Sequence, residues 1–172
     1  MGRLQWGTQD RSSTVLWYTF EPFYRNQSPT FRVMYGVGSR ESFGVEELPV
    51  VLVVEDDKSL QSIVEESLTD GGFEPAIAPS GEEAVTLLKS GLTKYRALVT
   101  DINLRGRMSG WEVAKRAREI DPEFPVVYMT GTSADDYGSQ GVPNSILLNK
   151  PFAPAQLVTA VSQLLNAGTS PK

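Results

Sequence analysis

The sequence of residues 48–168 predicts an α/β fold with a doubly wound, five-stranded parallel sheet and helices on both faces. Two observations support this prediction. Short apolar runs rich in Val, typical of strands buried on both faces, alternate with longer segments in which apolar residues recur at helical spacing. These signals follow one another as a repeated βα unit, and such units connect parallel strands through right-handed crossovers.

The first two strands are expected at 49–54 and 73–78, where apolar residues run together. The helix between them ends before the glycine pair at 71 and 72, because glycine is a common signal at a helix C-terminus. The apolar residues of this helix stand at helical spacing: Leu60, Ile63, Val64 and Leu68.

The later elements follow the same alternation. They are expected as helix 81–90, strand 96–100, helix 111–120, strand 126–129, strand 145–148 and helix 154–165. Between the last two strands, the glycines at 131, 138 and 141 leave only residues 133–137 for one helical turn. The fourth helix is therefore expected to be short or irregular.

Composition divides the chain in two. Residues 1–47 contain no Ala, Ile or Lys and hold nine of the 16 aromatic residues. We interpret them as an N-terminal leader, disordered or loosely attached, because short strands without a partner sheet are marginal. The alternative is a pair of short strands formed by the apolar clusters 15–18 and 31–35. Residues 48–168 form the α/β domain, and 169–172 form a short tail.

The residue types present exclude several kinds of chemistry. With no Cys and no His, the chain has no disulfide, thiolate nucleophile, imidazole base or zinc site built on those ligands. Metal binding must then use oxygen ligands, which suit Mg²⁺. The net charge of −5 argues against nucleic-acid binding. Because there is no secretory signal and no apolar run of about 20 residues, we expect a cytoplasmic protein with no membrane partner.

Polar residues gather where the predicted strands end, at one edge of the sheet. They are Glu55, Asp56, Asp101, Thr130 and Lys150. Taken alone, each has an ordinary structural role, as Asp57 has in capping the helix that follows it. Together they indicate a site, because ligands of open α/β sheets bind at this edge. Three converging carboxylates repel each other unless a cation neutralises them or their pKa values rise.

Four segments resemble the receiver domain of bacterial two-component response regulators, and the resemblance covers essentially all of residues 48–168. They are PVVLVVEDD at 49–57, ALVTDINL at 97–104, VVYMTG at 126–131 and NKPF at 149–152. The resemblance implies a flavodoxin-like sheet of strand order 2-1-3-4-5. It also implies the stand-alone type of response regulator, which consists of a single receiver domain.

The resemblance also implies a role for each site residue. Asp101 matches the phosphoacceptor. The Mg²⁺ ligands are Glu55, Asp56, Asp101 and the backbone carbonyl of Asn103, and the phosphoryl group is bound by Thr130 and Lys150. Mg²⁺ near Asp101 offsets negative charge on the transferred phosphoryl group.

The implied function is that of a phosphoacceptor in a phosphorelay and not of an enzyme, with at most slow self-dephosphorylation. Its expected donor is a sensor histidine kinase or a histidine phosphotransfer protein, because the chain itself contains no histidine. The few residues after the last predicted helix leave no room in this sequence for a DNA-binding output domain. Output is therefore expected through an unidentified downstream protein or through onward transfer of the phosphoryl group.

The sequence departs from the family pattern in three places. The loop after the phosphoacceptor is longer than usual and lacks its proline, and we interpret its Arg105 and Arg107 as solvated. Leu147 stands where the family has an aromatic residue that rotates with the switch hydroxyl. The segment 131–141 is rich in glycine, and we expect it to change between order and disorder on phosphorylation.

Two alternative functions remain open. A Mg²⁺-dependent phosphohydrolase of the haloacid-dehalogenase type would also use an Asp nucleophile, but it needs a second acid where this sequence has Asn103. The other alternative is a receiver-like binding module that no longer switches, which the departure at Leu147 and the altered loop would allow.

Overall fold

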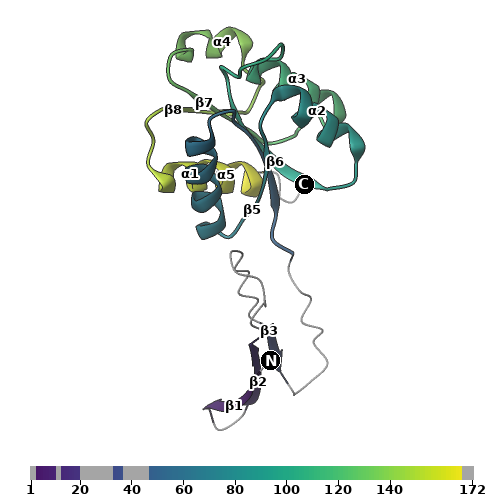
Figure 1. The fold of residues 1–172 in the computed structure, drawn as a ribbon, viewed down its shortest axis with the longest axis vertical. Helices are drawn as coiled ribbons and strands as arrows, with labels where there is room; N and C mark the ends of the chain where they lie inside the picture. The colour runs from purple at the N-terminus through teal and green to yellow at the C-terminus, as the bar shows by residue number, and fades with distance from the viewer. Residues whose placement is uncertain (1–2, 11–12, 20–32, 37–46, 168–172) are drawn as a thin grey trace. The chain divides into compact units, whose positions relative to one another are not determined.

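The computed structural model describes residues 3–10, 13–19, 33–36 and 47–167. The chain forms two compact units, Met1–Glu46 and Glu47–Lys172. Figure 1 shows the ribbon of the chain coloured by residue number. Residue 168 and the predicted tail at 169–172 lie outside the described residues.

The first unit contains a three-stranded antiparallel sheet of order β1-β2-β3. Its strands are β1 (Arg3–Asp10), β2 (Ser13–Thr19) and β3 (Val33–Gly36). The apolar cluster 15–18 lies in β2 and pairs with β3, and Leu16 stands opposite Tyr35. The cluster 15–18 thus pairs with residues 33–36, while residues 31 and 32 of the second cluster lie outside the described residues. Strand β1 is a third strand that the sequence pattern did not indicate. The interpretation of 1–47 as a leader stays a prediction.

The second unit is built on a five-stranded parallel sheet of order β5-β4-β6-β7-β8. The strands are β4 (Val50–Val54), β5 (Glu74–Ala78), β6 (Tyr95–Asp101), β7 (Val126–Thr130) and β8 (Ile146–Asn149). Numbered within this unit, the strand order is 2-1-3-4-5, which confirms the predicted doubly wound sheet.

Four helices of regular length connect or follow these strands. They are α1 (Lys58–Asp70), α2 (Gly81–Ser90), α3 (Gly110–Ile120) and α5 (Pro154–Ala167). Asp57 caps α1 as predicted, because its carboxylate accepts hydrogen bonds from the backbone N–H groups of Ser59 and Leu60. In the described part of the chain, none of the helices has the length and apolar character that crossing a membrane requires.

The connection between β7 and β8 is short and irregular, as its glycines predict. It contains one 3₁₀ turn, η1 (Ala134–Asp136), followed by the four-residue α4 (Tyr137–Gln140). Neither of these two elements has a side-chain hydrogen bond at its N-cap. The short helix therefore depends on tertiary contacts for its position.

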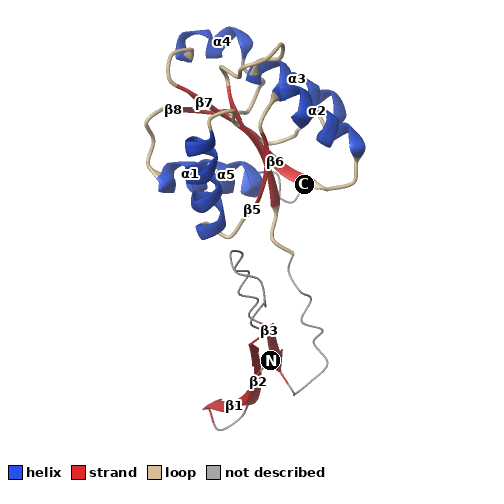
Figure 2. Cartoon of the chain, in the orientation of Figure 1, coloured by secondary structure: helices blue, strands red, loops and turns tan. Residues whose placement is uncertain are grey.

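The sheet lies between two layers of helices, with α1 and α5 on one face and α2 and α3 on the other (Figure 2). Successive residues of β4 pack into opposite layers. Val51 and Val53 lie in the core under α1 and α5, whereas Leu52 and Val54 lie under α2 and α3, and all four are fully buried. Slippage of this strand by one residue would exchange the two sets, so the packing on both faces holds its register.

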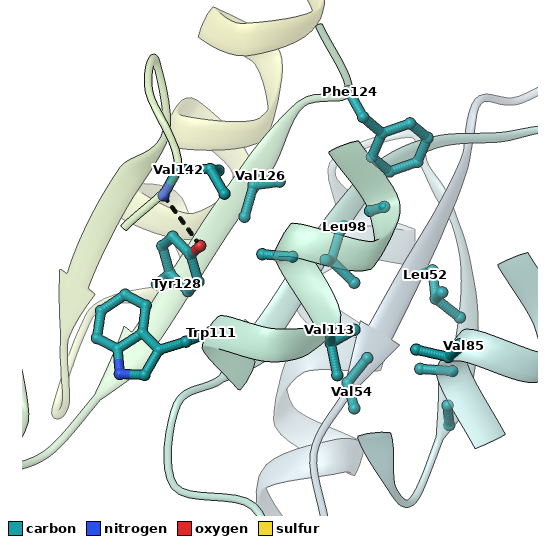
Figure 3. Packing of buried hydrophobic residues seen from close by; sticks show 14 of the residues in the cluster. Leu52, Val54, Val85, Leu98, Trp111, Val113, Phe124, Val126, Tyr128 and Val142 are labelled. Atoms are coloured by element: carbon teal, nitrogen blue, oxygen red, sulfur yellow. Dashed lines mark hydrogen bonds between the residues drawn. The ribbon is translucent and has the colours of Figure 1, made fainter. Parts of the chain in front are cut away.

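Three aromatic residues, Trp111 of α3, Tyr128 of β7 and Tyr137 of α4, form a cluster beside the β7–β8 connection. Figure 3 shows Trp111, Tyr128 and the hydrogen bond between Tyr128 and Val142. The ring centroid of Tyr128 lies 4.5 Å from that of Trp111 and 6.1 Å from that of Tyr137, the first residue of α4. Tyr128 is fully buried, and its hydroxyl accepts a hydrogen bond from the backbone N–H of Val142. Burial raises the pKa of Tyr128 to about 12, which keeps the side chain neutral. Leu147 is partly buried and packs against the hydrophobic core that contains Trp111 and Tyr128.

Candidate functional site

The predicted site residues lie at the carboxyl ends of four adjacent strands. Glu55 and Asp56 follow β4, while Asp101 is the last residue of β6. Thr130 is the last residue of β7, and Lys150 directly follows β8. Because all five strands run parallel, these ends share one edge of the sheet, as the sequence predicts.

Three carboxylates meet at this edge. One carboxylate oxygen from each of Glu55, Asp56 and Asp101 lies within 4.8 Å of the other two. The Glu55 side chain is 1% exposed, and those of Asp56 and Asp101 are each 12% exposed. At an effective dielectric constant of about 20, two unit charges about 5 Å apart interact by ~3 kcal/mol. The arrangement therefore depends on nearby positive charge.

Lys150 supplies part of that charge. Its Nζ lies 2.7 Å from Glu55 Oε2 and 3.0 Å from Asp101 Oδ2. Burial by itself would lower the pKa of Lys150, but the hydrogen bonds and charges of the two carboxylates outweigh this effect and raise it. Lys150 therefore remains protonated and joins the end of β8 to the ends of β4 and β6.

Thr130 is fully buried and organises the start of the loop after β7. Its Oγ1 accepts hydrogen bonds from the backbone N–H groups of Thr132 at 3.2 Å and Ser133 at 2.8 Å. Its backbone carbonyl accepts a hydrogen bond of 2.7 Å from the N–H of Lys150. Any displacement of Thr130 would therefore alter hydrogen bonds both to the loop after β7 and to the backbone of Lys150.

Asn103 bridges two loops beside the site. Its side-chain amide donates to Thr132 Oγ1 at 3.4 Å, and its Oδ1 accepts a hydrogen bond of 3.0 Å from Ser133 Oγ. Its backbone N–H donates to Asp101 Oδ1 at 3.3 Å. These side-chain bonds were not predicted from the sequence. The role of its backbone carbonyl as a metal ligand stays a prediction.

Arg105 corrects one interpretation made from the sequence. Its side chain is 83% exposed, as expected for a solvated arginine, but its Nε lies 2.9 Å from Asp56 Oδ2. Arg105 is therefore part of the site and not only a solvated charge. The sequence signal for it was the positive charge of an unusually long loop next to the acidic cluster. Arg107, by contrast, is joined to Glu82 through its backbone N–H.

Gly110 fixes the backbone on which Asp101 stands. A Cβ atom at position 110 would lie 2.0 Å from the backbone oxygen of Asp101 and 2.9 Å from Thr100 Oγ1. The N–H of Gly110 also donates to the carbonyl of Ile102 at 3.0 Å. The first turn of α3 can approach the end of β6 this closely because residue 110 has no side chain.

The donor set fits a hard divalent cation. Mg²⁺ prefers oxygen ligands and is usually held by one or two carboxylates together with water. The three carboxylates carry three formal negative charges and Lys150 carries one positive charge, which leaves two negative charges for a cation to balance. Asp56 and Asp101 are the more accessible acids. Glu55 already uses Oε1 for the N–H of Asp57 and Oε2 for Lys150.

This site can be compared with those of known proteins. A family model described as response regulator receiver domain matches residues 51–162, more than half of the 172-residue chain. The chain belongs to this family. It therefore contains the receiver domain of a two-component response regulator, whose family generally uses Mg²⁺ and interacts with kinases or phosphotransfer proteins.

Curated relatives of this receiver differ in length. A response regulator receiver protein of Anaeromyxobacter sp. is 38% identical over 85 residues, which cover 49% of this chain and 34% of that protein. The response regulator receiver protein CpdR of Brucella abortus is 29% identical over 119 residues, covering 68% of this chain and 97% of CpdR. The chain thus spans about a third of the first relative but nearly all of the second.

Solved structures share the receiver fold. A response regulator receiver protein from Sinorhizobium medicae is 48% identical in sequence and superposes with a TM-score of 0.69. The alignment covers 70% of this chain and 97% of that one. The chemotaxis protein CheY4 of Vibrio cholerae is 25% identical in sequence and superposes with a TM-score of 0.62. That alignment covers 69% of this chain and 99% of CheY4. The recognition of a receiver domain and of its fold from sequence is therefore confirmed.

We predict that Gly110→Ala will destabilise the receiver. The added methyl group must displace the end of β6 or the start of α3, and overpacking of this kind costs about 1–3 kcal/mol in the free energy of unfolding. Urea unfolding of the full chain measures this loss. Gly138→Ala is the control, because a Cβ there would meet no atom within 4 Å. Equal stability of Gly110→Ala and the wild type would contradict the packing described above.

Proposed function

We propose that this receiver accepts a phosphoryl group on Asp101 from the phosphohistidine of a partner protein, with Mg²⁺ bound by the acidic cluster. The observation that supports this most is the setting of Asp101. Its carboxylate lies 3.0 Å from the Lys150 ammonium and within 4.8 Å of the ligand oxygens of Glu55 and Asp56. A carboxylate with both a cationic partner and a metal-binding neighbourhood suits attack on an anionic phosphorus.

The proposed metal ligands are Asp56, Asp101 and the backbone carbonyl of Asn103, with Glu55 acting through water. When bound, Mg²⁺ would offset negative charge on the phosphoryl oxygens during transfer. The remaining chemistry belongs to the chain. An Asp101 carboxylate oxygen forms the new O–P bond while the P–N bond to the donor imidazole breaks, and the bonding electron pair passes to the imidazole nitrogen.

Lys150 and Thr130 complete the proposed binding of the phosphoryl group. Lys150 already contacts Asp101 and can pair with a phosphoryl oxygen after small movements of its ammonium group. Thr130 Oγ1 acts only as an acceptor in its hydrogen bonds with described residues, which leaves its own hydrogen available for a second phosphoryl oxygen. Binding of the phosphoryl group would therefore move Thr130 and, through its hydrogen bonds, the start of the loop after β7.

The proposed output is a change in the segment 131–141. Thr130 holds the N–H groups of Thr132 and Ser133, and Asn103 holds the side chains of the same two residues. At the far end, the Tyr137 hydroxyl donates to the backbone oxygen of Ser145 at 2.7 Å. Movement of Thr130 toward the phosphoryl group would rearrange the first anchor around that group and leave the second in place. The start of the segment would then become more ordered while its far end stays attached. The altered surface would signal to a downstream protein, or the phosphoryl group would be passed on.

We also propose that the receiver is not a phosphohydrolase. The residue two positions after Asp101 is Asn103, whose amide cannot act as a general acid or base and is engaged with Thr132 and Ser133. Loss of the phosphoryl group would then be slow. The donor must be a different protein, a sensor histidine kinase or a histidine phosphotransfer protein, because the sequence contains no histidine.

We predict that incubation with acetyl phosphate and Mg²⁺ adds one labile phosphoryl group to the wild type and none to Asp101→Asn. The variant keeps the shape of the side chain but removes the nucleophilic carboxylate. Intact mass analysis measures the adduct, and chelation of Mg²⁺ should suppress it. An adduct of equal yield on Asp101→Asn would place the acceptor elsewhere. Rapid turnover of p-nitrophenyl phosphate by the wild type would instead indicate a phosphohydrolase.

We predict that backbone amide exchange in 131–141 slows when beryllofluoride and Mg²⁺ are added. The phosphoryl mimic should take hydrogen bonds from the Thr130 hydroxyl and from nearby backbone N–H groups, which would order the start of the segment. Hydrogen exchange followed by mass spectrometry measures this change, with peptides from α1 and α5 as internal references. The Asp101→Asn variant is the control. Unchanged exchange in the wild type would reject the proposed switch.

A further inference from the structure

Arg105 contacts the same carboxylate that the proposed metal ion needs. Its Nε lies 2.9 Å from Asp56 Oδ2, and Asp56 is one of the two more accessible acids of the cluster. A guanidinium group and a divalent cation repel each other, and the repulsion is strong at separations of a few ångströms. Asp56 therefore binds each of these cations less tightly when the other is also present.

The conformation of the loop between β6 and α3 places Arg105 next to Asp56. Gly106 has a φ of +151°, a conformation that L side chains rarely adopt, and it turns the chain directly after the arginine. The next residue, Arg107, donates its backbone N–H to Glu82 Oε1 at 3.0 Å, which ties the loop to the first turn of α2. Leu104, on the other side, packs against the core under α2 and α3. The contact of Arg105 thus arises from an anchored loop.

The two cations of the site differ in how firmly they are held. Lys150 is 18% exposed and contacts two carboxylates, so its removal would leave buried charge without a partner. Arg105 is 83% exposed and contacts one carboxylate, so it can move into water at little cost. Lys150 should therefore stay paired with its carboxylates, whereas the guanidinium of Arg105 can leave Asp56 for solvent.

We propose that Arg105 is a tethered counter-ion that competes with the divalent cation for Asp56 and so sets the metal affinity of the receiver. The inference rests on the proposed function, because it assumes that the acidic cluster binds Mg²⁺. In the metal-free protein Arg105 neutralises Asp56, and binding of the cation displaces the guanidinium into solvent. Exposed ion pairs contribute about 0.2–1 kcal/mol, which corresponds to a change in metal affinity of between about 1.4-fold and 5-fold.

The test measures binding of Mn²⁺ by the full chain, followed through the electron spin resonance signal of the free ion, with Mg²⁺ as a competitor. The proteins compared are the wild type, Arg105→Gln and Arg107→Gln. Both variants lose one positive charge from the same loop, but Arg107 contacts Glu82 through its backbone, which the substitution keeps. We expect Arg105→Gln to bind both cations about 1.4- to 5-fold more tightly than the wild type, and Arg107→Gln to change the affinity by clearly less.

The outcomes separate the two proposals. Equal affinity of the wild type and Arg105→Gln would overturn the role of Arg105 and leave the metal site standing. An equal gain in both variants would also overturn it, because the effect would then come from the general charge of the loop. No binding to any of the three proteins would remove the metal site itself and with it this inference. Urea unfolding of each variant shows whether the fold is retained.

Discussion

The balance of charge among three crowded carboxylates and one lysine is the constraint on which this site depends. Glu55, Asp56 and Asp101 bring three negative charges to within a few ångströms, and Lys150 neutralises only one of them. The excess of two charges matches a divalent cation in charge, and the oxygen ligands match it in kind. Arg105, which contacts Asp56 from the solvent side, reduces this excess. Under the proposed function, a bound divalent cation would supply the missing positive charge.

The fold creates this crowding and also maintains it. Parallel strands end at one edge, so residues that are distant in sequence are brought together without any local signal between them. The close approach of Gly110 to the end of β6 fixes the backbone of Asp101, and Thr130 shares a backbone hydrogen bond with Lys150. Packed layers of helices on both faces hold the strands in register. The packing of apolar side chains in the core thus holds the strand ends together against the repulsion between the carboxylates.

Much of this could be predicted from the sequence, because each strand is a short apolar run and each site residue stands beside a strand end. Element boundaries differ from expectation by only a few residues, as for β7, which extends to Thr130. Arg105 was misjudged because its contact depends on a glycine conformation and on an anchor to Glu82, and neither is encoded in local spacing. The packing of Tyr137 against Trp111 and Tyr128 was likewise not predicted, since it joins residues that are distant in sequence.

The most direct test of the central claim is the crystal structure of the full chain grown with Mn²⁺, in which anomalous scattering locates the metal. The account predicts one strong peak bonded to carboxylate oxygens of Asp56 and Asp101, with Lys150 still paired to Glu55. An anomalous map with no peak at this edge of the sheet, or with Asp101 outside the coordination sphere of the ion, would contradict it.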